Sequence, residues 1–465
     1  MDKFKKNLLY AFIAQGTSTI LSILISLILP KMLGIEEFAY WQLFIFYSGY
    51  VGFFHFGLSD GLYLRYGGTN LGDMDKSLIG SQFRFMVIWQ LIISSFVLVA
   101  IPFVMSDQNR IFVWVMTAFY LITANAAWGL GYIFQAANET QIYSTGIIIS
   151  RAVFIIILLF LVVMKQYEYK QYIILYVSAQ SITMIYSMFK GKDFILAKWS
   201  SLKITIRETF YNMKIGINLT FSNIASSLIL GFGRGFVDSR WDISTFGLFS
   251  LAISLVNFIL QFITQISMVM FPALRQVTNN SKIEIYIMLR DSLGIILCGV
   301  LIFYVPIKVI LTWWLPHYTD SLRYLSVILP ICVFDGKMQM LYNTYLKVLR
   351  KERGLLYINI FSCFLSLALC IIFDFFHHEV IMAVFAMIIA IAARSIIASI
   401  YLSKIMRVEQ ESNLIFEIFL TVSFILLNYV LSPWIAFITY TTIFIIVIYI
   451  CREKIARILK FILKM

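Results

Sequence analysis

The side chains best able to do chemistry in this chain are charged residues set inside long apolar stretches. Placing arginine or lysine at the centre of a bilayer costs about 2.5–3.5 kcal/mol, so such residues usually face a cavity or a charged partner. Basic residues in these positions are Arg151, Arg234, Lys337 and Arg394, with Arg84 nearer the end of a stretch. Acidic residues in comparable positions are Asp60, Asp238 and Asp335.

Spacing along a helix separates two interpretations of these charges. Arg234 and Asp238 are four residues apart and share a helix face, so they either neutralise one another or serve a ligand or a gate. Asp335 and Lys337 are two residues apart and point to different faces. At least one of these two must therefore find another partner or water.

Three further polar residues each allow two interpretations. Asp60, in the sequence GLSDG, either binds a proton or cation or caps a helix beside the two glycines. His55 has phenylalanine on both sides and is either a hydrogen-bonded core side chain or a proton sensor. Arg151 lies near the end of its apolar stretch, where it either serves a ligand or extends to the membrane surface.

The composition places these charges in a membrane protein. The chain has 465 residues, of which 61% are apolar and 13% are charged, whereas soluble domains average about 45–50% apolar and 25% charged. Its mean hydropathy is +0.87. These values exclude a soluble enzyme, a disordered chain and a disulfide-built secreted domain. We therefore predict an all-α integral membrane protein, because a spanning helix needs about 20 largely apolar residues.

Apolar runs bounded by charged or turn residues predict about fourteen transmembrane helices. They cover residues 8–30, 38–63, 82–104, 111–135, 145–164, 171–189, 214–236, 244–272, 291–313, 322–346, 355–373, 380–403, 413–431 and 434–450. Of the 37 lysine and arginine residues, 26 fall on the side of the N-terminus, seven on the other side and four within spans. Because cytoplasmic loops collect basic residues, we predict that both termini are cytoplasmic.

The remaining composition gives no sign of a metal, a nucleotide or a nucleic acid. The positive-inside pattern accounts for most of the net charge of +13, and no soluble basic stretch is long enough for a nucleic-acid module. The four histidines and five cysteines lack metal-ligand or disulfide spacing. No glycine-rich phosphate loop occurs. We expect no cofactor and no direct use of ATP, and coupling to a proton or sodium gradient stays open.

Weak internal similarity divides the chain into two related halves. Segment 35–44 matches 243–252 at a shift of 208 residues, and 134–150 matches 346–362 at a shift of 212. Both halves begin inside, which predicts two pseudo-symmetric six-helix lobes related by an axis along the membrane normal. The predicted domains are an N-terminal lobe (1–190), a cytoplasmic interfacial linker (191–213), a C-terminal lobe (214–404), two further helices (405–450) and a basic amphipathic cytoplasmic tail (451–465). The tail predicts binding to anionic membrane lipids.

Four segments share a loose pattern of glycine, aromatic and charged residues. They are LPKMLGIEEFAYWQLFIF…FGLSDGLYLRY (Leu29–Tyr66), GFGRGFVDSRWDISTFGLFSLA (Gly231–Ala252), SMVMFPALRQV (Ser267–Val277) and YLKVLRKERGLLYIN (Tyr345–Asn359). Over the first twelve predicted helices the chain resembles the Wzx-type polysaccharide flippases of the multidrug/oligosaccharidyl-lipid/polysaccharide exporter superfamily. It departs from the family pattern at Ala39, where glycine is usual, and at Gly233, where aspartate is expected.

This resemblance implies a non-enzymatic transporter of the bacterial cytoplasmic membrane. Its substrate would be an oligosaccharide linked through pyrophosphate to a polyprenol lipid, moved outward by alternating access, with polysaccharide polymerase or export machinery as a further partner. A cationic cavity suits pyrophosphate, and the candidate substrate contacts are Arg234, Lys337, Arg394, Arg151 and Arg84. The candidate coupling or gating residues are Asp60, Asp238, Asp335 and His55. The candidate rings for stacking on sugars are Tyr40, Trp41 and Trp128.

Two alternative functions stay open. A cation-coupled multidrug exporter of the same superfamily would favour acidic cavity walls, whereas this chain has at least as many basic as acidic residues inside its spans. A membrane glycosyltransferase or glycan polymerase would need a large outer loop or a clustered acidic motif, and the predicted outer loops are short. The charge of the cavity therefore distinguishes the polysaccharide flippase from the multidrug exporter.

Overall fold

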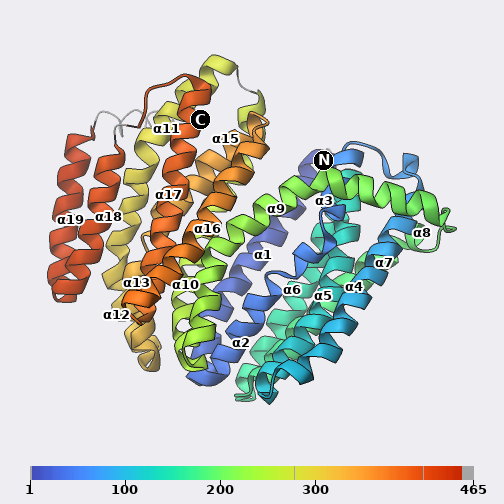
Figure 1. Cartoon of the computed structure of the whole chain (residues 1–465), viewed down its shortest axis with the longest axis horizontal. Coiled ribbons are helices and arrows are strands. Elements are labelled where there is room, and N and C mark those ends of the chain that lie inside the picture. The colour runs from blue at the N-terminus through green and yellow to red at the C-terminus, as the bar shows by residue number, and fades with distance from the viewer. Residues whose placement is uncertain (1–2, 277, 412, 453–465) are drawn as a thin grey trace. The chain divides into compact units, whose positions relative to one another are not determined.

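The computed structural model describes residues 3–276, 278–411 and 413–452, and the regular secondary structure in these ranges is entirely helical (Figure 1). The predicted all-α class is therefore confirmed. The chain forms two compact units, Met1–Ile224 (unit 1) and Ala225–Met465 (unit 2). The boundary between them falls within helix α9 (Leu202–Arg240).

Unit 1 is organised around one central helix, α5. Its helices are α1 (Lys3–Met32), α2 (Ile35–Ser48), η1 (Val51–His55), α3 (Leu58–Tyr66), η2 (Leu71–Asp73), α4 (Lys76–Val104), α5 (Gln108–Ala136), α6 (Thr140–Val163), α7 (Tyr169–Lys190), α8 (Lys192–Ile195) and the first part of α9. Helix α5 packs against α2, α3, α4, α6 and α7. Small buried residues such as Ala124, Ala127 and Gly131 allow this close packing.

The segment predicted as one helix over 38–63 is broken in the structure. Helix α2 ends at Ser48, the short helix η1 follows, and α3 begins after Phe56 and Gly57, both in the left-handed region with φ of 49° and 83°. Glycine adopts this conformation at little cost. A Cβ on Gly61 would lie 1.9 Å from the backbone oxygen of Asn212. Glycine therefore brings the backbones of α3 and α9 into direct contact.

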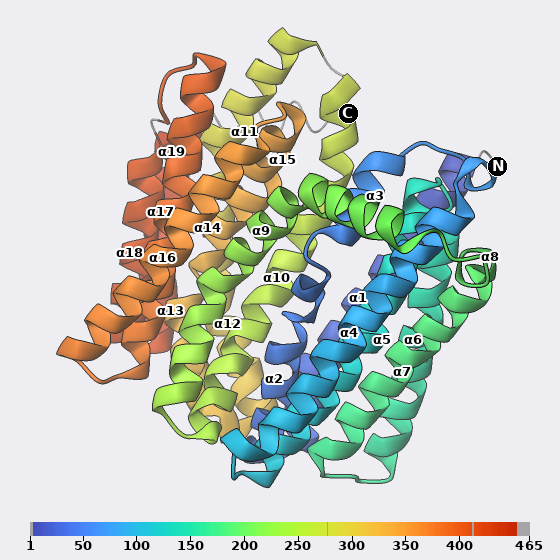
Figure 2. The same ribbon diagram turned by 45° about the vertical axis from the view of Figure 1, so that its right-hand side comes forward.

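Unit 2 is organised around α17 and the buried α14. Its helices are the second part of α9, α10 (Ile243–Gln276), α11 (Asn279–Val300), η3 (Leu301–Phe303), α12 (Tyr304–Trp314), η4 (Pro316–Tyr318), α13 (Thr319–Ile328), α14 (Ile331–Lys337), η5 (Met338–Tyr342), α15 (Asn343–Val348), α16 (Glu352–Phe376), α17 (Val380–Met406), α18 (Leu414–Val430) and α19 (Pro433–Ile450). Helices α16 and α17 lie side by side, as do α18 and α19 (Figure 2). The π-helical turn η5 interrupts the α-helical pattern directly after α14.

Eleven helices in the described ranges are long and apolar enough to cross a membrane. A twelfth crossing arises if the helices Pro316–Ile328 and Ile331–Val348, which meet at 49°, form one span. The single helix predicted over 322–346 is thus bent, at a point where Pro330 cannot donate a backbone hydrogen bond. The predicted span 413–431 corresponds to α18, which has 17 residues. The total of fourteen crossings stays a prediction.

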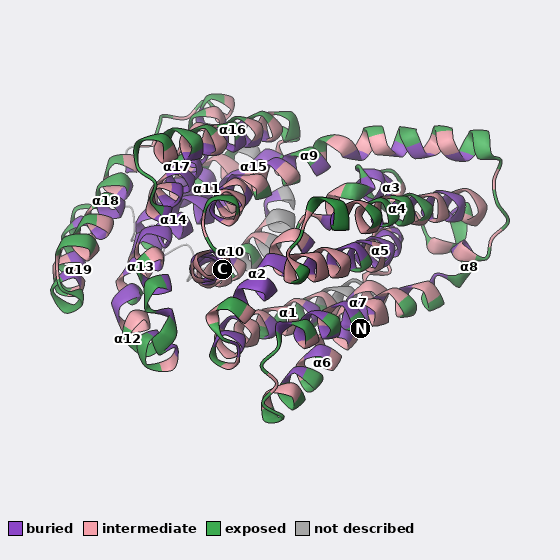
Figure 3. Ribbon diagram, turned by 60° about the horizontal axis from the view of Figure 1, so that its bottom comes forward, coloured by how far each residue is buried: buried purple, intermediate pink, exposed green. Residues whose placement is uncertain are grey.

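The surface of the helices agrees with a lipid environment. All seven residues of α14 are buried, whereas α12 and α19 carry exposed apolar side chains (Figure 3). Phe103 on α4 is 88% exposed and Phe375 on α16 is 84% exposed. Large exposed apolar surfaces on soluble proteins mark sites of interaction, and here they extend along whole spans. All five cysteines are free and buried, as expected for small apolar side chains.

The segment that follows α7 contains helix α8 and the start of α9. Helix α8 has four residues, and α9 begins at Leu202, so the second half of the predicted linker 191–213 belongs to a helix of 39 residues. Leu196 and Trp199 between the two helices are exposed. Apart from residues 451 and 452, the predicted amphipathic tail over 451–465 lies outside the described residues.

Candidate functional site

Unit 1 contains a cavity of about 280 Å³ with a mixed polar and aromatic wall, referred to below as the polar cavity. Helices η1, α3, α5, α6 and α9 contribute to it. Its lining residues are Gly52, Phe53, His55, Asp60, Trp128, Tyr132, Tyr143, Thr220 and Asn223. A carboxylate, an imidazole, an amide and four large aromatic rings thus face one space, a combination typical of small-ligand sites.

The break between η1 and α3 brings the two predicted coupling residues Asp60 and His55 to this cavity. Asp60 lies in the first turn of α3, is 5% exposed and accepts a hydrogen bond from the Thr220 hydroxyl at 2.5 Å. No side chain caps the N-terminus of α3, so this geometry does not support the interpretation of Asp60 as a cap. The backbone N–H of Gly57 donates to His55 Nδ1 at 3.0 Å, which leaves Nε2 as the donor of a neutral ring.

Among the three rings predicted to stack on sugars, Trp128 lines the polar cavity. Its ring lies against Gly52, where a Cβ would approach Trp128 Cζ3 to 3.2 Å. Tyr40 and Trp41 instead belong to the packed interior of the unit. Tyr40 stacks on Tyr169 with ring centroids 5.1 Å apart, and its hydroxyl donates to Asp107 at 3.1 Å.

Arg84 has a structural position. Its guanidinium donates to the carbonyl oxygens of Ile195 at 2.5 Å and Ala197 at 2.6 Å. It also lies over the Trp199 ring at 4.3 Å from the centroid. These contacts hold the end of α8 and the residues after it against α4. The guanidinium of Arg84 thus donates to backbone carbonyl groups. These contacts give no support to the prediction that Arg84 binds substrate, which stays a prediction.

Arg151 on α6 is surrounded by tyrosines. Its guanidinium lies 5.6 Å from the centre of the Tyr176 ring, and Tyr176 in turn contacts Tyr120 and Phe154. The side chain is only partly buried. Arg151 therefore stays a candidate for contact with a ligand.

In unit 2, two of the predicted residues form a buried ion pair with each other. Arg394 Nη1 lies 3.1 Å from Asp335 Oδ1, and the side chains are 3% and 8% exposed. Arg394 Nε donates to Asn359 Oδ1 at 2.9 Å. The other carboxylate oxygen of Asp335 accepts from Gln339 in η5 at 2.5 Å, and Thr264 on α10 donates to Gln339 at 2.6 Å. One polar network thus joins α10, α14, η5, α16 and α17.

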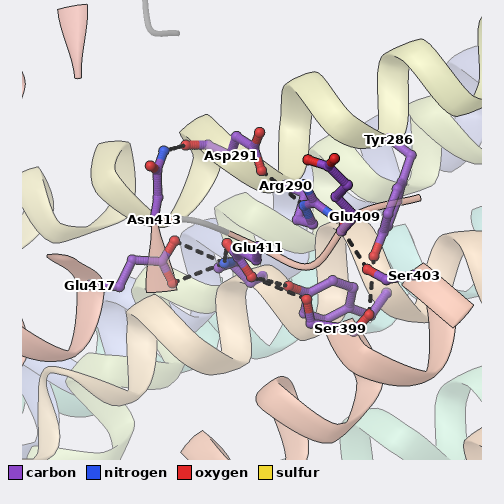
Figure 4. Close-up of polar contacts among 11 residues, drawn as sticks. Tyr286, Arg290, Asp291, Ser399, Ser403, Glu409, Glu411, Asn413 and Glu417 are labelled. Atoms are coloured by element: carbon purple, nitrogen blue, oxygen red, sulfur yellow. Dashed lines mark hydrogen bonds and ion pairs between the residues drawn. The ribbon is translucent and has the colours of Figure 1, made fainter. Parts of the chain in front are cut away.

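Lys337 forms a second ionic cluster, which we call the lysine–glutamate triad (Lys337, Glu411 and Glu417; Figure 4). Lys337 Nζ donates to both carboxylate oxygens of Glu417 at 2.9 Å and also to Glu411. Lys337 and Glu417 are at most 1% exposed. Glu411 accepts further hydrogen bonds from Ser399 at 3.1 Å and Tyr342 at 3.3 Å. A Cβ on Gly294 would lie 1.8 Å from Glu417 Oε1, so this glycine makes room for the carboxylate.

The different faces predicted for Asp335 and Lys337 explain these two clusters. Asp335 pairs with Arg394 from α17, whereas Lys337 pairs with Glu417 from α18. Glu411 and Glu417 are not among the predicted site residues, although Glu417 lies inside the predicted span 413–431 and was detectable as an intramembrane charge. As a consequence, Lys337 is neutralised in this structure and does not present an unpaired cation to a cavity.

Arg234 and Asp238 lie on α9 in unit 2. Arg234 donates to Ser250 Oγ at 3.1 Å, and its guanidinium lies 5.5 Å from the centre of the Phe246 ring. Asp238 is partly buried one turn further along the helix. Both residues stay candidates. The described residues contain no group of three or more histidine, cysteine, aspartate or glutamate side chains able to hold a metal.

Comparison with known proteins identifies the family of this chain. Residues 4–278 match the family model described as polysaccharide biosynthesis protein, which covers more than half of the chain. The chain therefore belongs to this family, and the predicted resemblance is confirmed. None of the curated proteins compared with the chain matches it.

Solved structures with the same fold come from the MOP superfamily. The lipid II flippase MurJ in its inward closed conformation has a TM-score of 0.69 at 14% identity, over 97% of this chain and 99% of MurJ. An inward-facing multidrug resistance MATE family transporter has a TM-score of 0.66 at 13% identity, over 84% of this chain and 94% of that one. A MOP superfamily transporter from Pyrococcus furiosus, described as having a binding pocket of reversed polarity, has a TM-score of 0.55 at 12% identity, over 88% and 96% of the two chains. These likenesses show that the chain shares the fold of these proteins.

Proposed function

We propose that this protein moves polyprenyl-pyrophosphate-linked oligosaccharide units from the inner to the outer leaflet of the membrane by alternating access. The products would feed the synthesis of capsule, O-antigen or exopolysaccharide. Membership of the polysaccharide biosynthesis family carries the proposal. MurJ, which has the same fold, is described as a flippase of lipid II.

The polar cavity supports a sugar ligand. Aromatic rings pack against the apolar faces of sugar rings, and carboxylate and amide groups hydrogen-bond to hydroxyl groups. Trp128, Tyr132 and Tyr143 provide the rings, and Asp60 and Asn223 provide the polar groups. Among the basic residues predicted from the sequence, Arg151 and Arg234 remain candidates for the pyrophosphate, because Lys337 and Arg394 are paired with carboxylates and Arg84 donates to backbone carbonyls.

The proposal includes a particular arrangement in the membrane. The chain would cross fourteen times as two six-helix lobes followed by two helices, with both termini in the bacterial cytoplasm and with polymerase or export machinery as a partner. A cysteine introduced as Thr319→Cys tests the orientation, because the five native cysteines are buried. We expect an impermeant thiol reagent to label it only from outside intact cells. Labelling only from the cytoplasmic side would overturn this orientation.

Coupling to a proton or sodium gradient would drive the cycle. The candidates are Asp60, His55, Asp238 and Asp335. Asp60 is the strongest of these on geometry, since it is buried at the cavity with a hydroxyl donor beside it. A carboxylate in this position can take up a proton or a cation without breaking a buried ion pair.

One observation favours a second candidate function, a cation-coupled multidrug exporter. The polar cavity combines an acidic side chain with aromatic walls, and such walls suit organic cations through cation–π contacts. A MATE family multidrug transporter also shares the fold. The identity of the transported molecule separates the two functions.

Reconstituted vesicles provide the test. The purified chain would be placed in phospholipid vesicles with a polyprenyl-pyrophosphate-linked oligosaccharide, and exposure of the glycan to a lectin added outside would be followed with time. We expect the wild type to accelerate this exposure and Trp128→Ala to slow it strongly. Trp313→Ala, at a tryptophan that is 79% exposed, is the matched control. Transport of cationic dyes with no movement of the lipid-linked glycan would favour the multidrug exporter.

A further inference from the structure

A second cavity in unit 1, which we call the apolar groove, has a volume of about 480 Å³. Helices η1, α3, α4 and α9, together with Phe56 between η1 and α3, form its wall. The residues that define its character are the apolar side chains Phe85, Met86, Trp89, Phe210, Met213 and Ile217. Its volume lies within the range of about 300–1,000 Å³ typical of small-ligand sites.

One exposed cation, Lys214, belongs to this apolar wall. It lies on a stripe of α9 whose members are three or four residues apart and therefore share a helix face. The stripe consists of Lys203, Arg207, Phe210, Lys214 and Ile217. The groove thus offers hydrocarbon contacts around one end of a row of positive charges, which is complementary to a molecule with an apolar chain and a phosphate.

The apolar groove and the polar cavity share a wall residue. His55 lines both, and the backbone contact of Gly57 and Gly61 with α9 lies next to it in the sequence. A polar compartment rich in aromatic rings and an apolar compartment with a cation are therefore built on the same short break between η1 and α3. An amphiphile with a sugar at one end and a hydrocarbon chain at the other matches this pair of surfaces.

We infer that the apolar groove is the binding site for the phosphate-proximal part of the polyprenyl chain, with the Lys214 ammonium at the phosphate. This inference rests on the proposed function, because the polyprenyl chain in the groove is taken to be that of the transported lipid. Trp89, Phe210 and Met213 bury the first isoprene units, and burial of their apolar surface supplies the affinity. Lys214 supplies a charge-assisted hydrogen bond that selects a lipid carrying phosphate at the end of the chain.

Photocrosslinking of the full chain tests this site. The probe is a polyprenyl pyrophosphate with a diazirine on its first isoprene unit, in vesicles of phosphatidylethanolamine and phosphatidylglycerol. We expect crosslinks to concentrate on Trp89, Phe210 and Met213 and to be competed by unlabelled polyprenyl pyrophosphate. Crosslinks spread evenly over exposed helices would overturn the assignment. Equal labelling of these residues by a diazirine phosphatidylglycerol would show a site for bilayer lipid and would also overturn it.

Two variants sharpen the result. Met213→Trp fills the groove, and Lys214→Gln removes its charge at an exposed position where folding is not at risk. We expect each to weaken crosslinking about tenfold, equivalent to roughly 1.4 kcal/mol. The matched controls are Ile92→Trp, an exposed residue of α4 outside the groove wall, and Lys192→Gln on α8, and both should crosslink like the wild type. An unchanged yield in Lys214→Gln would overturn the role of that ammonium.

The same vesicles separate failure of this inference from failure of the proposed function. If the lipid-linked glycan crosses the membrane while the polyprenyl probe crosslinks outside the apolar groove, the groove assignment is wrong and the proposed function stands. If the polyprenyl probe crosslinks in the apolar groove while the lipid-linked glycan does not cross the membrane, the groove is a polyprenyl site and the proposed function is wrong.

Discussion

The buried charges of the two units have different partners. In unit 2, Lys337 and Arg394 are each paired with carboxylates at 2.9–3.1 Å. In unit 1, Asp60 accepts a hydrogen bond from a neutral hydroxyl and borders a cavity. A buried charge that is already paired contributes to packing and specificity, whereas a charge beside a cavity can still receive a ligand. From this comparison we expect the paired charges of unit 2 to act mainly in stability and the cavity of unit 1 to be the better placed for a ligand.

The largest expected effect tests the structural role in unit 2. Lys337→Ala leaves two buried carboxylates without their cation, and removal of one partner from a buried pair costs about 3–5 kcal/mol. We expect a large drop in the thermal unfolding temperature in detergent. Exposed Lys351→Ala is the control and should unfold like the wild type. A normal unfolding temperature in Lys337→Ala would mean that the lysine–glutamate triad does not stabilise the unit.

A matched pair of aspartate variants tests the comparison directly. Asp335→Asn leaves the Arg394 charge buried and should destabilise the protein by about 1.5–3 kcal/mol. Asp60→Asn keeps an acceptor for Thr220, so it should unfold normally yet lose transport of the lipid-linked glycan about tenfold or more, the equivalent of at least 1.4 kcal/mol. Unfolding and transport are measured on the same preparations. If both variants lose stability equally, the two units do not differ in the way described.

A variant at the contact between α3 and α9 tests whether backbone packing positions Asp60. Gly61→Ala would place a Cβ 1.9 Å from Asn212 O, so the two helices must move apart. Overpacking of this kind costs about 1–3 kcal/mol, and transport should fall further than stability because Asp60 moves with α3. Gly72→Ala, with nothing within 4 Å of its Cβ, is the control. Unchanged transport in Gly61→Ala would show that this contact is not needed at the cavity.

The smallest expected effect concerns a pair that is open to solvent. Arg65 Nη1 lies 2.8 Å from Glu208 Oε2, with the two side chains 31% and 16% exposed. Such pairs contribute about 0.2–1 kcal/mol, so Arg65→Gln should change the unfolding temperature only slightly and less at high salt. A loss as large as that of Lys337→Ala would remove the distinction between buried and exposed pairs in this protein.

Much of the fold could be predicted from the chain, because lipid requires long apolar helices whose backbone hydrogen bonds are satisfied internally. The break after α2 could not, since the run from 38 to 63 is apolar enough over its length to predict one helix, and only its glycines indicate a break. For the candidate site, the positions of Asp60, Asp335 and Lys337 inside spans were detectable. Their partners were not, because Glu417 lies 80 residues from Lys337 and local spacing carries no information at that distance.

The sequence by itself determined that this protein is helical, lives in a membrane and carries a few charges inside it, because hydropathy and helical spacing are local properties. Only the tertiary structure decided which of those charges are neutralised. Lys337 and Arg394 meet carboxylates from α18 and α14, while Asp60 is placed at a cavity by glycine contacts between α3 and α9. The energy of a buried charge depends on what lies within a few ångströms of it, and packing of distant segments sets that distance.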